Sequence, residues 1–363
     1  MPATVYFANL HCRTEQSNKL SKIQRLCDAV GLKKTLRKNE VAGIKLHFGE
    51  YGNDTHLKPA FVRQVVDKIK KCGAKPFLTD SNTLYSGMRH NAVDHLNVAY
   101  LHGFTPAVVD APVIIADGLF GENDVPVRID CKHFREVHIA DVIRRAPSLT
   151  VLSHFKGHEM AGFGGAIKNL AMGGGSVRGK RDQHDTHVQV SENDCIGCGK
   201  CVRVCPQGAL SLVDGKSHVD VSKCIGCFEC ITVCPVKAIS IDWATQMTPF
   251  VERMTEYAYG VVKGREKRIC YLNFVLNVTP DCDCVSWSDL PIVPDLGILA
   301  STDPVALDQA CLDLVNKTPS LAPKLADAPD KFKARWPHTV GELQLTYGEE
   351  IGLGTREYTI ENV

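Results

Sequence analysis

The sequence has no long apolar run, no excess of one charge and no basic, apolar leader. Its apolar stretches fall short of the roughly 20 residues that span a bilayer, so we expect no membrane insertion. The 42 basic and 41 acidic residues give a formal net charge of +1, which offers nucleic acid no general attraction. The opening MPATVYFANL lacks the basic and apolar regions of a secretion signal. We therefore expect a cytoplasmic protein that binds neither membrane nor nucleic acid.

Cysteine, by contrast, is abundant, with 16 among 363 residues. In a cytoplasmic chain, closely spaced cysteines bind metal more often than they form disulfides. Eight of the 16 lie between Cys195 and Cys234, so we expect those eight to be metal ligands.

The two flanks of this cysteine-rich stretch share an α/β pattern. Continuous apolar runs are followed by helical patterns, which predicts a mostly parallel, covered sheet in one body or in two lobes. The expected strands are Val41–Phe48, Pro76–Thr79, Val113–Ala116, Leu149–Ser153, Ile269–Leu276 and Leu296–Ala300. The expected helices are His56–Lys71, Asn91–His102, Gly164–Ala171, Gln246–Val262 and Asp303–Val315. We therefore interpret residues 189–242 as an insert in one α/β domain made of residues 1–188 and 243–363.

Two near-copies of one motif occupy the insert, starting at Cys195 and at Cys224. Each copy reads C-x2-C-x2-C-x3-C-P, the spacing of bacterial [4Fe–4S] sites, in which the fourth cysteine binds the other cluster. One predicted ligand set is therefore Cys195, Cys198, Cys201 and Cys234, and the other is Cys224, Cys227, Cys230 and Cys205. Gly197 and Gly226 would permit tight turns that point N–H groups at the sulfurs.

Zinc is the alternative for these cysteines, because zinc sites also use C-x2-C pairs. Two complete runs fit two cubane clusters better than separate tetrahedral sites. Over about fifty residues the insert resembles the bacterial two-cluster ferredoxins. The resemblance implies an α+β insert and one-electron transfer at low potential.

Polar residues follow several of the predicted strands, in the loops Gly49–Asn53, Asp80–Asn82 and His154–His158. Ligands of open α/β sheets bind beyond the carboxyl ends of strands, so these loops form our candidate site. Lys45 and His47 alternate along the first strand and should point to one face.

Glycines and lysines before the insert predict an anion cradle at the start of a helix. The residues expected there are Gly164, Gly165 and Asn169, together with Lys156 and Lys168. Neither G-x-G-x-x-G nor the P-loop pattern is completed in this stretch, so we reject both nucleotide motifs. The nearby histidines are candidates for proton transfer or metal binding: His154, His158, His184 and His187.

A C-x-C pair, Cys282 and Cys284, follows the insert between aspartates. Two close thiols can bind a third metal or form a redox-active pair, and the alternative is that they have no role. Asp303 precedes Pro304 and is predicted to cap a helix, with a catalytic role as the alternative.

Several stretches outside the insert carry a family resemblance: Lys45–Glu50, Lys156–His158, Gly164–Leu170, Cys282–Cys284 and Gly297–Ala306. They resemble an uncharacterised iron–sulfur centre family, domain of unknown function number 362, whose members often carry a ferredoxin insert. That family is distantly similar to the nickel-dependent lactate racemases, which implies a two-lobed α/β fold with a cleft.

Three functions follow as alternatives. The first is a redox enzyme of ferredoxin type that relays electrons through two [4Fe–4S] clusters to a small anionic ligand in an α/β cleft. There Lys45, Lys156 and Lys168 would hold the anion, and His47, His158 and His187 would move protons or bind metal. The second is an electron carrier or docking subunit for a partner oxidoreductase. The third is a metal or cofactor maturation protein in which Cys282, Cys284 and a histidine hold an additional metal.

Overall fold

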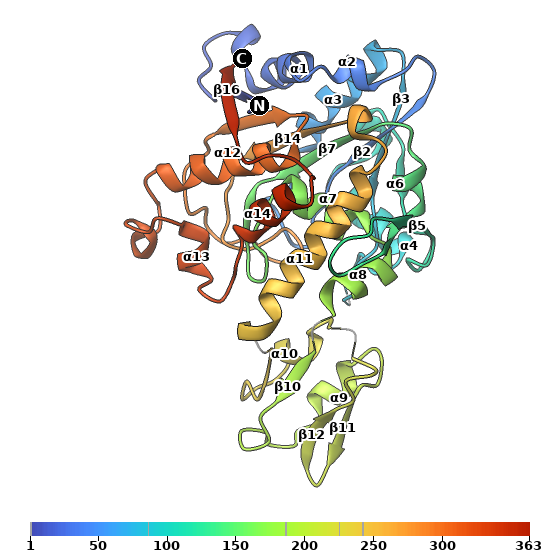
Figure 1. Ribbon diagram of the computed structural model, residues 1–363, viewed down its shortest axis with the longest axis vertical. Coiled ribbons are helices and arrows are strands. Elements are labelled where there is room, and N and C mark those ends of the chain that lie inside the picture. Colours follow the sequence, from blue (N-terminus) through green and yellow to red (C-terminus); the bar gives the residue numbers. More distant parts are fainter. Residues whose placement is uncertain (1, 86, 186, 225, 242) are drawn as a thin grey trace.

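One eight-stranded sheet organises the α/β part of the chain, which we call the body (Figure 1). The computed structural model describes residues 2–85, 87–185, 187–224, 226–241 and 243–363. The sheet order is β16-β1-β15-β14-β7-β2-β3-β4. In chain order these strands are β1 Ala3–Ala8, β2 Val41–Lys45, β3 Lys75–Asp80, β4 Val113–Ile115, β7 Leu149–His154, β14 Ile269–Val275, β15 Gly297–Ser301 and β16 Tyr358–Asn362.

The prediction of a mostly parallel α/β sheet is confirmed. Parallel pairing joins β14, β7, β2, β3 and β4, as well as β1 and β16, whereas β15 runs antiparallel to both β1 and β14. All six predicted strands are present, and strands from both sides of the insert share this one sheet. Sequence patterns missed β1 and the edge strand β16, whose residues are mostly exposed and carry little apolar signal.

Helices cover both faces of the sheet. The five predicted ones are α3 Pro59–Lys71, α4 Ala92–Leu101, α7 Ala166–Gly174, α11 Trp243–Val262 and α12 Pro304–Lys317. The others in the body are α1 Lys19–Ala29, α2 Leu32–Thr35, α5 Pro106–Val109, α6 Asp141–Arg145, α8 Val177–His184, α13 Lys331–Arg335 and α14 Leu343–Glu350, with short 3-10 turns at Glu15–Ser17, Glu266–Arg268 and Pro323–Leu325. None of the described helices is both long and apolar enough to cross a bilayer.

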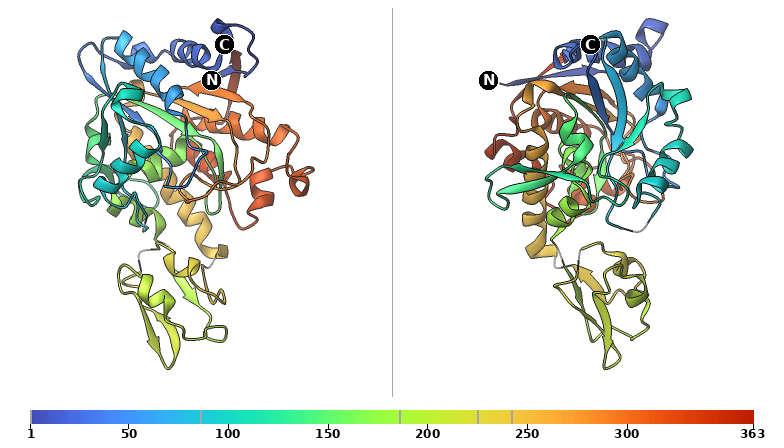
Figure 2. Two further views of the ribbon diagram at one scale, coloured as in Figure 1. Left: turned by 180° about the vertical axis from the view of Figure 1, so that it is seen from behind. Right: turned by 90° about the vertical axis from the view of Figure 1, so that its right-hand side faces the viewer.

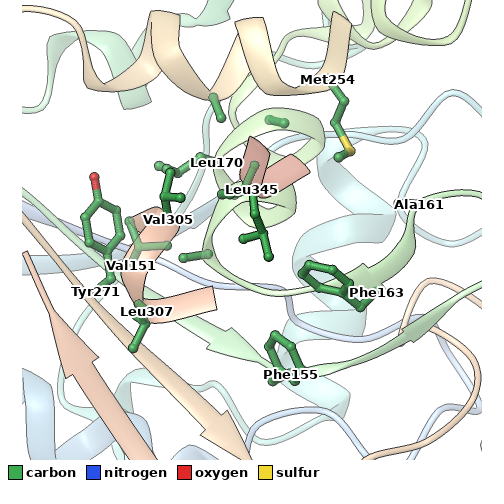
Figure 3. Close-up of a cluster of buried hydrophobic side chains, with 14 of the residues drawn as sticks. Val151, Phe155, Ala161, Phe163, Leu170, Met254, Tyr271, Val305, Leu307 and Leu345 are labelled. Carbon is green, nitrogen blue, oxygen red and sulfur yellow. The ribbon is translucent and has the colours of Figure 1, made fainter. Parts of the chain in front are cut away.

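Two hydrophobic clusters hold the layers together. One joins α7, α11 and α12 to the sheet, and the other joins α1 and α3 to it. Figure 3 shows part of the first cluster, with Leu170, Val305 and Leu345 close together and Phe155 and Phe163 nearby. Two hairpins extend the body, formed by β5 Asp124–Arg128 with β6 Glu136–Ala140, and by β8 Lys156–His158 with β9 Gly162–Gly164.

Residues 188–241, which we call the cysteine-rich segment, project from one end of the body in every view (Figures 1 and 2). Strand β10 Val188–Val190 pairs with β13 Ile239–Ile241 at its base, and β11 Leu210–Val213 pairs with β12 Lys216–Val219. Short helices α9 Lys200–Val204 and α10 Glu229–Thr232 complete it. Residue 242, with which the predicted insert ends, lies outside the described residues. Strands β10 and β13, near the two ends of the segment, thus lie side by side.

Candidate functional site

The eight motif cysteines line two separate hollows in the cysteine-rich segment. Cys195, Cys198, Cys201 and Cys234 line the first, which encloses about 320 Å³ of empty space, partly open to solvent. Cys205, Cys224, Cys227 and Cys230 line the second, with about 330 Å³. Each hollow thus takes three cysteines from one motif and the fourth from the other, in the grouping that the spacing predicts.

Backbone N–H groups point at several of these sulfurs. Ser217 donates to the Cys195 sulfur at 3.3 Å, Ala209 to Cys205 at 3.2 Å and Ala238 to Cys234 at 3.2 Å. Bonds from Ser217 and Gly197 hold the pKa of Cys195 below its usual value. All 16 cysteines are described and all are free thiols. Eight cysteines without disulfides, several of them with N–H donors at their sulfurs, form a donor set that fits iron–sulfur clusters.

One aromatic side chain connects the second hollow to the body. Phe228 lines that hollow, and its ring lies 5.7 Å, centroid to centroid, from the ring of His184 at the end of α8. Phe228 has φ +62°, and the equivalent residue of the first motif is Gly199, with φ +66°. A phenylalanine in this left-handed conformation costs about 1–2 kcal/mol, which the contact with the body helps to offset.

In the body, buried charged side chains gather near the carboxyl end of β2 in a group that we call the polar cluster: Lys45, Glu50, Asp80, Arg89, His154, Lys156, Lys180 and Asp283. Lys45 Nζ lies 2.9 Å from the Asp80 carboxylate and 2.7 Å from the Asn169 amide oxygen. Lys45 is only 1% exposed, and this burial lowers its pKa in spite of Asp80. A side chain at Gly173 would collide with the lysine, since an added Cβ would lie 2.2 Å from Nζ.

A second pair in this cluster links β8 to the C-x-C loop. Asp283 is fully buried, and its carboxylate contacts His154 Nδ1 at 2.9 Å and Lys156 Nζ at 3.5 Å. Burial would raise the pKa of Asp283, but these two neighbours outweigh it and hold the pKa well below its usual range. Gly157 permits the close approach, because an added Cβ would lie 2.2 Å from the Pro280 oxygen.

Arg89 forms the third buried pair. Its guanidinium contacts Glu50 at 3.0 Å, His47 Nε2 at 2.9 Å and the Tyr85 hydroxyl at 2.6 Å. Burial and the Arg89 charge hold the pKa of His47 well below its usual value. His47 therefore faces the cluster as a neutral ring.

The C-x-C thiols lie beside Lys168 and His158. Lys168 Nζ is 3.7 Å from the Cys282 sulfur, and ligand atoms of His158, Cys282 and Cys284 all lie within 4.8 Å of one another. The hydrogen bond with Cys284 and the charges of Lys168 and Lys156 hold the pKa of Cys282 well below its usual value. The hydrogen bond to Cys282 and burial raise the pKa of Cys284. The pair thus loses one proton easily and holds the second.

The loops predicted to form a site do gather, but the glycines serve the fold. The first N–H groups of α7, at Ala166 and Ile167, bind Asp308 at 2.7 and 2.9 Å. Gly165 leaves room for that carboxylate, since an added Cβ would lie 2.3 Å from it. The predicted anion cradle at this helix start is therefore wrong, because the chain supplies the anion itself.

Three further predicted residues also have clear positions. Gly164 leaves room for lysine side chains, because an added Cβ would lie 3.2 Å from Lys168. Asn169 uses its amide nitrogen on the Leu152 oxygen and its amide oxygen on Lys45, so it ties α7 to the sheet. His187 lies beside Asp185 at 3.9 Å, next to the cysteine-rich segment, and takes no part in the contacts described above.

Sequence patterns assigned no individual role to five members of the polar cluster: Glu50, Asp80, Arg89, Lys180 and Asp283. Glu50 and Asp80 lie in loops predicted to form the site, and Asp283 lies between the C-x-C cysteines, whereas Arg89 lies outside every stretch that the patterns singled out. Lys180 donates to Ser81 at 2.6 Å, and burial lowers its pKa to about 8. Asp303 caps α12 by accepting from Val305 and Ala306, as predicted.

No curated protein matches the chain. Among solved structures, the lactate racemase apoprotein from Thermoanaerobacterium thermosaccharolyticum is similar over 76% of this chain and 51% of its own, with 12% identity and a TM-score of 0.39. A structural-genomics target from Thermotoga maritima is similar over 84% of this chain and 57% of its own, with 10% identity and a TM-score of 0.38. The chain thus spans a little over half the length of each.

A family model covers most of the chain. It matches residues 43–313, which include most of β2, the polar cluster, the cysteine-rich segment, the C-x-C pair and most of α12. By that match, the chain belongs to the family described as Domain of unknown function (DUF362).

Proposed function

We propose that this protein transfers electrons through two [4Fe–4S] clusters to a small anionic ligand at the polar cluster of the body. The observation that carries the proposal is the pair of cysteine-lined hollows with exchanged fourth cysteines. Cys195, Cys198, Cys201 and Cys234 would hold one cluster, and Cys205, Cys224, Cys227 and Cys230 the other. When bound, such clusters supply one-electron transfer at potentials that hydrogen bonds to sulfur and exposure adjust.

The ring contact between Phe228 and His184 connects the two regions. Phe228 belongs both to the wall of the second hollow and to the packing of the body core. Burial and, after it, the nearby positive charge of Lys168 lower the pKa of His184 to about 3. Lys168 in turn contacts Cys282. These four residues lead from the second hollow to the C-x-C pair.

An anionic ligand fits the charge balance of the polar cluster. Lys45, Lys156 and Arg89 each face a buried carboxylate, at Asp80, Asp283 and Glu50. Half-buried Lys168 instead faces the Cys282 sulfur. When the Cys282 sulfur carries no charge, the Lys168 amine can bind an added anion, because charge-assisted bonds gain strength where water is scarce.

One observation favours a role as electron carrier for a partner protein. Exposed apolar side chains line the first hollow: Ile196 at 62%, Leu212 at 46% and Val236 at 40% exposure. Apolar groups around a redox site suit a transient docking surface, because weak electron-transfer encounters bury little area. In this variant electrons enter or leave at the first hollow, through contact with another protein.

Metal analysis of protein purified without oxygen tests the cluster proposal. We expect about eight iron and eight sulfide per chain, with paramagnetic resonance signals of [4Fe–4S]⁺ after reduction. Cys201→Ser should lose the signal of one cluster, while Cys27→Ser, a fully buried thiol of the body, should keep both. Stoichiometric zinc, or disulfides among the eight cysteines, would refute the proposal.

A second experiment separates the enzyme from the carrier. Lys168→Ala should abolish reoxidation of reduced clusters by added small anions and leave iron content unchanged. Lys223→Ala, a 60%-exposed lysine of the segment, is the matched control. If Lys168→Ala behaves like wild type and Ile196→Asp slows exchange with redox proteins, the carrier function is favoured.

A further inference from the structure

We infer that Cys282 and Cys284 form a reversible dithiol–disulfide couple that exchanges two electrons. The inference rests on the proposed function for the origin of its electrons, but its geometry stands apart from the clusters. Both thiols belong to the body, outside the two hollows, and their ligand atoms lie within 4.8 Å of each other.

A turn brings the two thiols together. The Val285 N–H donates to the Cys282 carbonyl at 3.2 Å, which closes a four-residue turn with Asp283 and Cys284 at its centre. Disulfides need Cα atoms about 4.4–6.8 Å apart, a span that two residues in one turn can meet. A ring closed over a single intervening residue is strained, and strained disulfides are the readily reduced ones.

The surrounding contacts hold this turn in place. Asp283 accepts from His154 with its carboxylate, and its carbonyl accepts from the Glu50 N–H at 2.8 Å. The Cys284 carbonyl accepts from the Tyr85 hydroxyl at 3.2 Å. Both sulfurs can therefore change oxidation state while the backbone stays anchored on both sides.

The side chains next to the sulfurs suit thiolate chemistry. Lys168 places a positive charge 3.7 Å from the Cys282 sulfur, and a nearby cation increases the fraction of reactive thiolate. Cys282 is 4% exposed, whereas Cys284 is half-buried and offers the sulfur that an outside reagent reaches first.

A metal ion is the competing occupant, and the hydrogen bonds of His158 argue against it. His158 Nδ1 accepts from the backbone N–H groups of Met160 and Ala161, both at 3.1 Å. A neutral ring that accepts at Nδ1 carries its proton at Nε2, so it has no free lone pair for a metal. Such a ring can instead donate to a sulfur. A divalent cation would also lie close to the charge of Lys168.

The chemistry balances as a two-electron couple. On oxidation, the two sulfurs form one S–S bond and release two electrons and two protons. The electrons go one at a time to two one-electron carriers of the iron–sulfur class, and the protons go to water. With glutathione disulfide as oxidant, Cys284 passes its proton to the Cys282 thiolate, and the Cys284 thiolate so formed displaces one glutathione thiolate to give a mixed disulfide. Cys282 then releases that proton to water, attacks the mixed disulfide and displaces the second glutathione thiolate.

The test is a thiol titration of the full-length protein in glutathione buffers of increasing oxidised fraction. After alkylation in denaturant and tryptic digestion, mass spectrometry of peptide 269–317 reports its four cysteines, Cys270, Cys282, Cys284 and Cys311. We expect Cys282 and Cys284 to become linked within the buffer range, while Cys270 and Cys311 stay alkylated. Lys168→Met should slow alkylation of the native pair about tenfold at neutral pH, and Lys223→Met should not.

The outcomes separate this inference from the cluster proposal. Iron and sulfide are measured on the same samples. Cys201→Ser should change the iron and sulfide content but not the glutathione ratio at which the pair becomes linked, because glutathione itself is the redox partner in this test. A linked pair in iron-free protein would support this inference and refute the clusters. A pair that stays reduced in every buffer, or a stoichiometric metal lost in both Cys282→Ser and Cys284→Ser, would overturn this inference alone.

Discussion

The body and the cysteine-rich segment differ in what stabilises them. The body has two large apolar clusters against one sheet, and the buried charges of Lys45 and Arg89 are paired with carboxylates. The segment has one small cluster of Val188, Cys201, Leu210, Cys230 and Ile239, two of which are cysteines. A fold with so little apolar core relies on cross-links or bound metal. The two regions should therefore respond differently to the same perturbation.

Iron removal should give the largest difference between the regions. With its cysteines unligated, we expect the segment to unfold while the body stays folded, because in such small domains metal binding supplies the folding free energy. Limited proteolysis after anaerobic chelation should cut within residues 189–241. If near-ultraviolet circular dichroism shows that the body unfolds together with the segment, the two regions are not independent.

The same difference explains what the sequence could predict. In the segment, the spacing of the cysteines is local, so the grouping of Cys201 with Cys195 and Cys234 around one hollow could be predicted from the motif alone. In the body, the hydrophobic periodicity and the ends of the predicted strands located the loops that gather around Lys45. The Asp308 cap on α7 joins positions more than 140 residues apart, and no local pattern shows which N–H groups a distant carboxylate occupies.

The direction of a single strand in the sheet could not be predicted from the sequence either. An apolar run such as β15 has the same composition in a parallel or an antiparallel pair, and the path of the chain between strands decides its direction. Arg89 gave no signal because a single arginine in a polar stretch is most often exposed. Its 1% exposure follows from three partners that the fold assembles.

Arg89→Met should have the next largest effect, confined to the body. It leaves Glu50 buried without its cation, and breaking such a pair costs about 3–5 kcal/mol. Urea unfolding followed by circular dichroism should report this loss, and iron content should be unchanged. Arg128→Met is the control, since the Arg128–Asp130 pair is exposed and should contribute nothing measurable. A loss of iron in Arg89→Met would show that the regions are coupled.

Acidification should destabilise the body through its buried histidines. Burial lowers the pKa of His95 to about 3, below the usual value near 6.5 that applies in the unfolded chain. The contribution of neutral His95 to the free energy of unfolding is therefore fully present above about pH 6.5. It falls as the pH drops toward 3, because in this range only the unfolded chain takes up the proton. His95 alone should lower the unfolding free energy by about 2 kcal/mol between pH 7 and pH 5.

His95→Gln should remove that share of the pH dependence, measured as the change in unfolding free energy between the two pH values. His218→Gln, in an exposed position of the segment, should leave the pH dependence unaltered. An equal slope in wild type and His95→Gln would show that His95 is already protonated in the folded protein.

The smallest effect on stability is expected where the two regions meet. Phe228→Gly relieves a left-handed backbone, worth about 1–2 kcal/mol, and removes a ring contact with His184 worth about 0.5–1.5 kcal/mol. The relieved strain offsets the lost ring contact but not the lost burial of the half-buried ring, so the free energy of unfolding should fall by about 1 kcal/mol while hydrogen exchange of the α8 amides increases. Gly199→Ala adds backbone strain at the equivalent position of the first motif, where an added Cβ lies near Leu212, so it should destabilise the segment and leave α8 exchange unaltered. Unchanged α8 exchange in Phe228→Gly would mean that the strained phenylalanine serves the segment alone, and the connection from the second hollow to Lys168 would lose its first member.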